Sequence, residues 1–274
     1  MYTAFNLKLS LNNFKGIDEY IQLGKQQKVE KSEVAKKELD SFILSDTVLD
    51  GEKLSDSWFK TIQSDIFISH SHNDADLAFA LAGWLKKEFD LDVFLDETVW
   101  GSADELLKQL DKKYCYQEES KTYNYQKRNL TTSHVHAMLS TAIQSVMDNS
   151  EVIFFLNTQE SFPAISDVLE ENSEYTLSPW IYQEVINAKL LRPINWAEYR
   201  RKRVLQHSLY ESASSLLKVA YKTPVNDFTP LDASTLIAWQ EKYVNAKDEP
   251  YGGLFLDTYD HPLNLLYDLV FDKK

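Results

Sequence analysis

Trp180 and Glu184 lie four residues apart, which places both side chains on one face if this segment is helical. An aromatic ring beside a carboxylate suits a pocket for a sugar and a flat base, because the ring excludes water and the carboxylate accepts hydrogen bonds from ribose hydroxyl groups. Such a carboxylate can also stabilise an oxocarbenium-like transition state while a glycosidic bond breaks. The same spacing also fits a core tryptophan beside a solvated glutamate, which is the usual state of glutamate.

A turn rich in serine and histidine, Ser69–His72, is the second candidate for chemistry. His70 and His72 share one face of an extended segment and could bind a metal, but the sequence offers no evident third ligand. His134 and His136 are also two apart, at a predicted helix start, where that spacing puts them on different faces. We therefore expect no metal site.

The elements that position these residues follow from hydrophobic periodicity. Asp65–Ile68 is a short apolar run typical of a buried strand, and Asp92–Asp96 predicts a second one. Between them Asn73 or Asp74 can cap a helix, whose apolar residues recur at helical spacing: Leu77, Leu81, Trp84, Leu85 and Phe89. Strand, helix and strand in so short a span predict a right-handed crossover with parallel strands. Ligands bind beyond the carboxyl ends of such strands, which draws attention to Ser69–His72 and to Asp96.

The rest of the chain supplies further elements around this unit. An alternating segment near Phe5 and Leu7 predicts a half-buried strand at a sheet edge, and Ser178-Pro179 is a strong helix start. The other expected elements, in chain order, are surface helices over 14–44, a loop over 98–103 pivoting at Gly101, a short helix over 104–113, a long tyrosine-rich loop, a helix from Ser133, a buried strand over 152–156, a strand over 216–221, and helices over 234–243 and 263–271.

Composition narrows the classes of function. The chain has 274 residues, 43% of them hydrophobic, with a net charge of −13. That charge disfavours binding to nucleic acid or to anionic membranes, which depends on clustered lysine and arginine. Cys115 is the only cysteine, so neither an internal disulfide nor a cysteine-built metal site can form. The sequence shows neither a signal peptide nor an apolar run of transmembrane length, so we expect a cytoplasmic protein.

The order of these motifs resembles the TIR (Toll/interleukin-1 receptor) domain family. The resemblance rests on "DIFISHSHND", an amphipathic helix, "DVFLDE" and later "SPWIYQE", and covers about Ser64 to Leu190. It implies a flavodoxin-like α/β fold, with a central parallel sheet and helices on both faces. Residues 1–60 would then be an N-terminal extension with an edge strand and helices, and 61–274 a TIR-like domain with an insertion at about 100–132. The loop after Asp96 lacks the family's usual Arg-Asp-x-x-Pro-Gly run.

The resemblance also implies an activity. Enzymatic members of the family split NAD⁺ at the nicotinamide–ribose bond, giving nicotinamide and ADP-ribose or a cyclic isomer, and prokaryotic members often serve antiphage defence. By this resemblance Glu184 is catalytic, Phe67, Ser69 and His70 line the nucleotide pocket, Trp180 lies beside Glu184, and Asp96 precedes a loop that admits substrate. NAD⁺ would be the substrate and no separate cofactor is implied. The implied partners are further copies of the chain and a downstream effector that responds to the nucleotide product.

Two alternatives remain open from the sequence. One is a non-catalytic TIR module that joins partner proteins through its surface loops. The other is an enzyme similar to nucleoside deoxyribosyltransferases, which share the architecture and a catalytic glutamate but act on free deoxynucleosides. A panel of substrates separates these possibilities from NAD⁺ cleavage.

Overall fold

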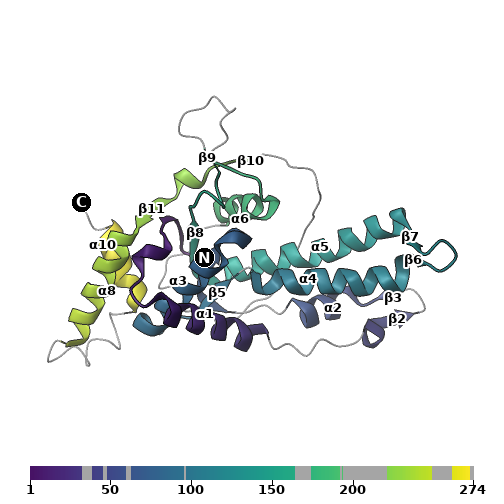
Figure 1. The fold of residues 1–274 in the computed structure, drawn as a ribbon, viewed down its shortest axis with the longest axis horizontal. Coiled ribbons are helices and arrows are strands. Elements are labelled where there is room, and N and C mark those ends of the chain that lie inside the picture. The colour runs from purple at the N-terminus through teal and green to yellow at the C-terminus, as the bar shows by residue number, and fades with distance from the viewer. Residues whose placement is uncertain are drawn as a thin grey trace.

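Five short strands from distant parts of the sequence form one parallel sheet, which the helices surround (Figure 1). The computed structural model describes residues 1–32, 39–45, 48–59, 63–95, 97–163, 174–191, 193, 221–248 and 261–271. The strand order is β11-β1-β8-β4-β5, and every pairing between neighbours is parallel. The strands are β1 (Thr3–Lys8), β4 (Ser64–Ser69), β5 (Val93–Leu95), β8 (Ser150–Leu156) and β11 (Thr229–Asp232).

The two central strands carry continuous apolar runs because both of their faces are covered. Every residue of β4 and of β8 is buried. Phe67 of β4 pairs with Ile153 of β8 on one side and with Phe94 of β5 on the other. The predicted α/β architecture, with a central parallel sheet and helices on both faces, is confirmed, as is the parallel pairing of the strands that flank the first crossover.

The N-terminal strand β1 is an interior strand, so the prediction of a sheet edge is wrong. β1 lies between β8 and β11. Asn6, whose polarity suggested a solvated face, is 5% exposed, because its side chain accepts a hydrogen bond from Asn157 Nδ2 at 2.9 Å and donates one to Asn226 Oδ1 at 3.2 Å. A flavodoxin-like sheet has the order 2-1-3-4-5. Here β5, β4 and β8 take the first three places and β1 takes the fourth, so part of the segment assigned to an extension completes the sheet.

One side of the sheet, which we call the α3 face, is covered by α1 (Ile17–Ser32), α3 (Ala75–Phe89), α8 (Ala233–Asp248) and α10 (Pro262–Phe271). α1 and α3 cross at a pair of glycines. Gly24 of α1 faces the backbone carbonyl of Phe79, and Gly83 of α3 faces that of Tyr20, so a Cβ atom at either glycine would overlap a carbonyl oxygen. The two backbones can approach this closely only because both positions lack a side chain.

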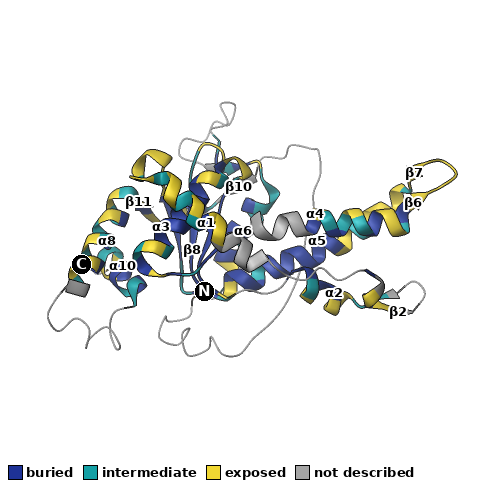
Figure 2. Cartoon of the chain, turned by 60° about the horizontal axis from the view of Figure 1, so that its bottom comes forward, coloured by how far each residue is buried: buried dark blue, intermediate teal, exposed yellow. Residues whose placement is uncertain are grey.

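The opposite side, the α6 face, is covered by α2 (Gly51–Trp58), α4 (Glu97–Leu110), α5 (Tyr125–Asp148) and α6 (Pro179–Leu190). Its core includes Phe67 and Phe155 from the sheet together with Leu54, Leu106 and Val135 from the helices. α4 and α5 pack together and project far beyond the sheet (Figure 1). α5 is buried near the sheet and exposed toward its outer end (Figure 2).

The projecting pair of helices corrects several predictions from the sequence. Residues 98–103, expected to be a loop with Gly101 as its pivot, belong to α4. A π-helix (Asp111–Cys115) and a two-stranded ribbon, β6 (Tyr116–Gln117) with β7 (Thr122–Tyr123), replace most of the expected tyrosine-rich loop. α5 begins at Tyr125, with Asn124 Oδ1 accepting from the backbone N–H of Lys127, and not at Ser133. The expected insertion is therefore mostly helical.

Smaller elements complete the described chain. They are 3₁₀ turns at Leu11–Asn13, Leu39–Phe42, His72–Asp74 and Val225–Asp227, a ribbon of β2 (Ile43–Ser45) with β3 (Val48–Leu49), and a ribbon of β9 (Glu174–Thr176) with β10 (Tyr221–Thr223). The predicted C-terminal helices are confirmed as α8 and α10, whereas residues 216–220 of the predicted strand lie outside the described residues. Among the described helices, none combines the length and apolar character needed to cross a membrane.

Candidate functional site

Ser69 and Glu184, 115 residues apart in the sequence, meet at the carboxyl end of β4. Side chains alternate along a strand, so Ser69 points to the same side as Phe67, toward the α6 face. There Ser69 Oγ donates a hydrogen bond to Glu184 Oε2 at 2.6 Å. Both residues are 1% exposed. A buried carboxylate is thereby fixed at the end of a central strand, where ligands of parallel sheets bind.

The helix that carries Glu184 begins as the sequence predicted. Ser178 is the N-cap, its hydroxyl oxygen accepting a hydrogen bond from the backbone N–H of Ile181 at 3.3 Å, and Pro179 is the first helical residue. Trp180 lies in the first turn and Glu184 one turn later, so the two share a face. Trp180 is half-buried and packs against the apolar core of the α6 face. The burial of Glu184 contradicts the alternative of a solvated helix glutamate.

His136 of α5 joins this cluster, although the sequence suggested no such role. Its ring meets that of Trp180 edge-to-face, with the ring centroids 5.6 Å apart. His136 is 5% exposed, and its Nδ1 has no hydrogen-bond partner among the described residues. Burial lowers the pKa of His136, while the negative charge of Asp104 opposes the shift. One turn along α5, the buried Ser140 Oγ likewise has no described partner.

The remaining predicted site residues lie around this pair in different ways. His70 follows Ser69 directly and is buried. Phe67 lies inside the core, where its ring stacks on that of Phe94 with the centroids 5.5 Å apart. Asp96 lies outside the described residues. His72 and His134 are exposed, unlike His70 and His136, and no group of three or more potential metal ligands occurs in the described part of the chain.

A network of hydroxyl and carboxylate groups binds the loop after β4 to the loop after β8. Asp74, expected as a helix cap, instead accepts hydrogen bonds from Thr158 Oγ1 at 2.6 Å and Ser161 Oγ at 2.9 Å. The Ser161 hydroxyl also accepts from the backbone N–H of Ser71 at 3.0 Å, and Asn73 Nδ2 donates to Glu160 Oε2 at 2.6 Å. These hydrogen bonds connect the two strand ends that flank the site.

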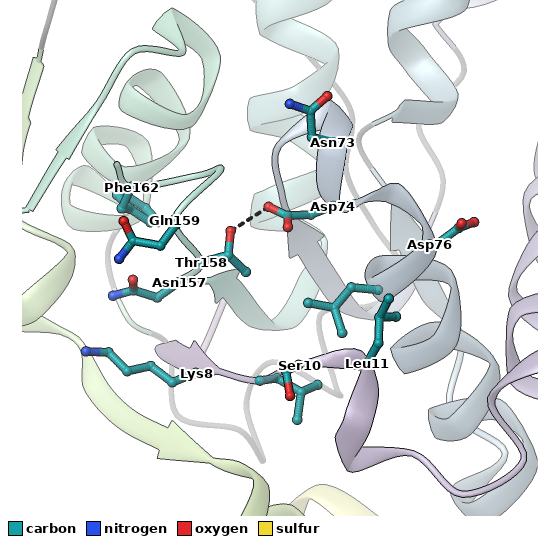
Figure 3. Close-up of a pocket in the computed structure, with 12 residues that line it drawn as sticks. Lys8, Ser10, Leu11, Asn73, Asp74, Asp76, Asn157, Thr158, Gln159 and Phe162 are labelled. Carbon is teal, nitrogen blue, oxygen red and sulfur yellow. Dashed lines mark hydrogen bonds between the residues drawn. The ribbon is translucent and has the colours of Figure 1, made fainter. Parts of the chain in front are cut away.

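An open pocket of about 610 Å³ adjoins this network (Figure 3). Lys8, Asn157 and Thr158 reach it from the ends of β1 and β8, while Asp74 and Asp76 reach it from the start of α3. Glu184 and Trp180 do not line it. Phe162 both lines the pocket and belongs to the apolar core of the α6 face, which also includes Ile181 of α6.

The sequence predicted Ser69 and His70 at the end of a strand and Glu184 on the helix that begins at Pro179, but it gave no sign of His136 or of the role of Asp74. The buried pair offers a carboxylate held by a hydroxyl, on the same helix face as Trp180, a combination suited to a cationic or oxocarbenium-like centre. No protein-family model, curated protein or solved structure matches the chain.

Proposed function

We propose that the chain is a TIR-like enzyme that cleaves the nicotinamide–ribose bond of NAD⁺, with Glu184 as its catalytic carboxylate. The observation that carries the proposal is the hydrogen bond of 2.6 Å between Ser69 Oγ and Glu184 Oε2 at the carboxyl end of β4. The resemblance assigns both residues to one site, and folding brings them together across 115 positions. The parallel sheet with helices on both faces is compatible with the flavodoxin-like fold of that family.

The proposed reaction needs a fixed negative charge beside the ribose. When the C–N bond breaks, its electron pair moves to the pyridinium nitrogen, and nicotinamide leaves as a neutral molecule. The oxocarbenium cation left on the ribose is stabilised by the Glu184 carboxylate, which the Ser69 hydroxyl holds in position. Water attacks C1′ and loses a proton to give ADP-ribose, whereas an internal nucleophile of the same molecule gives a cyclic isomer. Trp180 and His136 supply the flat walls beside the carboxylate.

Substrate access requires a rearrangement, since Glu184 is 1% exposed. We assign this movement to residues Thr158–Pro163, because Phe162 in this loop both lines the open pocket and belongs to the core of the α6 face. The loop is held closed by the bonds of Thr158 and Ser161 to Asp74. Family members often complete their sites by self-association, and a second copy of the chain is the partner we propose to favour the open form.

The direct test is to incubate NAD⁺ with purified wild type and with Glu184→Gln over a range of protein concentrations. Chromatography with mass detection would measure nicotinamide and the ADP-ribose products. We expect Glu184→Gln to lose at least about 100-fold in rate, because the amide keeps the shape but not the charge. Ser69→Ala keeps the carboxylate but removes its hydrogen bond to the serine hydroxyl, and should lose about 10-fold in rate.

Glu119→Gln is the matched control, because Glu119 is exposed on the β6–β7 ribbon and should keep full activity. Full activity of Glu184→Gln would remove Glu184 from the mechanism. The same assay with deoxynucleosides tests the deoxyribosyltransferase alternative, which predicts base release from these substrates and none from NAD⁺. If neither substrate class is cleaved at any protein concentration, the interaction-module alternative is favoured instead.

A further inference from the structure

A second cavity, of about 520 Å³, lies on the α6 face beneath the projecting α4–α5 pair. Its floor is apolar and buried, made by Leu54 of α2, Leu110 of α4 and Met138 of α5. Leu130 lines the cavity and is 60% exposed, which places an apolar side chain at the mouth. Neither Ser69 nor Glu184 lines it, so it is distinct from the candidate active site.

The charged side chain that lines this cavity is positive, although the chain has a net charge of −13. Lys127 is that residue, and no acidic side chain lines the cavity. Lys127, Leu130, Thr131, His134 and Met138 follow one another at helical spacing on one face of α5. The polar groups of the lining thus lie along the same helix face as its apolar residues.

Of the two adjacent basic residues Lys127 and Arg128, Lys127 is the one that can bind an anion in the cavity. Its neighbour Arg128 is bound by Asp111, with Nε 2.7 Å from Oδ2, and Asp111 also accepts from Thr131 Oγ1 at 2.6 Å. Asp50, next to the lining residue Gly51, pairs with Lys53 at 2.7 Å. Lys127 forms no ion pair with any residue in the described ranges. The nearby carboxylates are therefore engaged elsewhere.

We propose that this cavity binds a small anion with an apolar tail, of the class of free medium-chain carboxylates. The tail would cover Leu54, Leu110 and Met138, and the carboxylate would meet Lys127 at the mouth. A cavity of this size is within the range that holds small ligands, and its apolar floor offers too few hydrogen-bonding groups for a nucleotide. The inference does not depend on NAD⁺ cleavage.

The test is isothermal titration calorimetry of the full chain with sodium decanoate. We expect saturable binding, and binding about five-fold weaker for Lys127→Gln or for the uncharged analogue decanol, as the loss of one partly exposed ion pair implies. Gly51→Leu should abolish binding by filling the cavity, because the nearest heavy atom to a Cβ at Gly51 is Met138 Cε at 3.9 Å, which leaves space for a side chain.

Lys112→Gln is the matched control, since it removes an exposed positive charge outside the cavity and should bind decanoate as the wild type does. Leu130→Glu provides a second disruptive variant at an exposed position, so that its loss of binding cannot come from a misfolded core. The proposal is overturned if decanoate does not bind saturably, if decanol binds as tightly as decanoate, or if Gly51→Leu and Leu130→Glu both bind like wild type.

Discussion

The two faces of the sheet differ in how they treat buried polar groups. On the α3 face the polar groups of two buried aromatic side chains are hydrogen-bonded: Tyr267 OH donates to Glu151 at 2.7 Å, and Trp239 Nε1 donates to the carbonyl of Pro262 at 2.8 Å. On the α6 face, buried side-chain atoms of His136, Ser140, Thr141 and Asn187 have no hydrogen-bond partner among the described residues. All four lie on α5 and α6, the helices next to Ser69 and Glu184.

This difference suggests that the α3 face mainly stabilises the fold, whereas the α6 face carries the candidate active site. A buried polar group without a partner costs about 1–3 kcal/mol, so such groups are rare, and a catalytic role is one of the reasons for which proteins keep them. The α3 face has close backbone contact and satisfied polar groups, so it stabilises the sheet. The α6 face gives up stability beside the candidate active site and also contains the cavity lined by Lys127. Substitutions at close contacts on the α3 face should therefore cost more stability than substitutions on the α6 face.

The largest effect on stability is expected on the α3 face, from Gly83→Ala. A methyl group at this position overlaps the backbone carbonyl of Tyr20, and a backbone atom cannot rotate away as a flexible side chain can. We expect the free energy of unfolding to fall by about 3 kcal/mol, measured by urea denaturation. A Cβ atom at Gly51 on the α6 face lies no closer than 3.9 Å to a neighbouring atom. Gly51→Ala should therefore change the free energy of unfolding by less than about 1 kcal/mol. Equal losses in the two variants would remove the distinction between the faces.

Two buried serines test the effect of a missing hydrogen-bond partner on stability, and the expected changes are smaller than for Gly83→Ala. Ser140 and Ser150 are both fully buried, but Ser150 Oγ lies 2.8 Å from Ser64 Oγ and donates to the carbonyl of Val146 at 2.8 Å, whereas Ser140 Oγ has no described partner. Ser140→Ala should raise the free energy of unfolding by about 1 kcal/mol, and Ser150→Ala should lower it by about 1 kcal/mol. Thermal and urea unfolding measure both changes. Destabilisation by Ser140→Ala would mean that its hydroxyl is satisfied in the folded protein.

The fold was predictable from sequence where hydrophobic periodicity is strong and local. The runs at β4 and β8 and the stripe of α3 are of this kind, because burial on both faces leaves few polar residues to interrupt them. The projecting α4–α5 pair was predicted only in part, as a short helix over 104–113 and a helix from Ser133, because the rest of its surface is solvated and its tyrosines and lysines resemble a loop. The interior position of β1 was also missed, because it depends on pairing with residues about 150 and 220 positions away.

The candidate site shows the same limit. Ser69 and Glu184 were predictable because each follows a clear local signal, a strand end and a proline-started helix. The partnership of His136 with Trp180 was not, because it joins two helices across 44 residues and neither helix signals the other. The bonds of Asp74 to Thr158 and Ser161 join two loops in the same way. Polar residues after two neighbouring strands were the only available signal for that network.

The smallest effect concerns the dependence of stability on pH, which His136 should alter. Burial lowers the pKa of His136 below its usual 6.5, so below that pH the unfolded chain binds a proton that the folded chain does not, and folding becomes less favourable as the pH falls. Well above pH 6.5 the imidazole is neutral in both states and the contribution vanishes. We expect His136→Leu to lose less stability than wild type between pH 7.5 and pH 5, measured by urea unfolding at each pH. His134→Leu, at an exposed position two residues before His136 on a different face of α5, should keep the wild-type dependence. If both variants show the wild-type dependence of stability on pH, then His136 is solvated in the folded protein, and water reaches the α6 face beside Trp180.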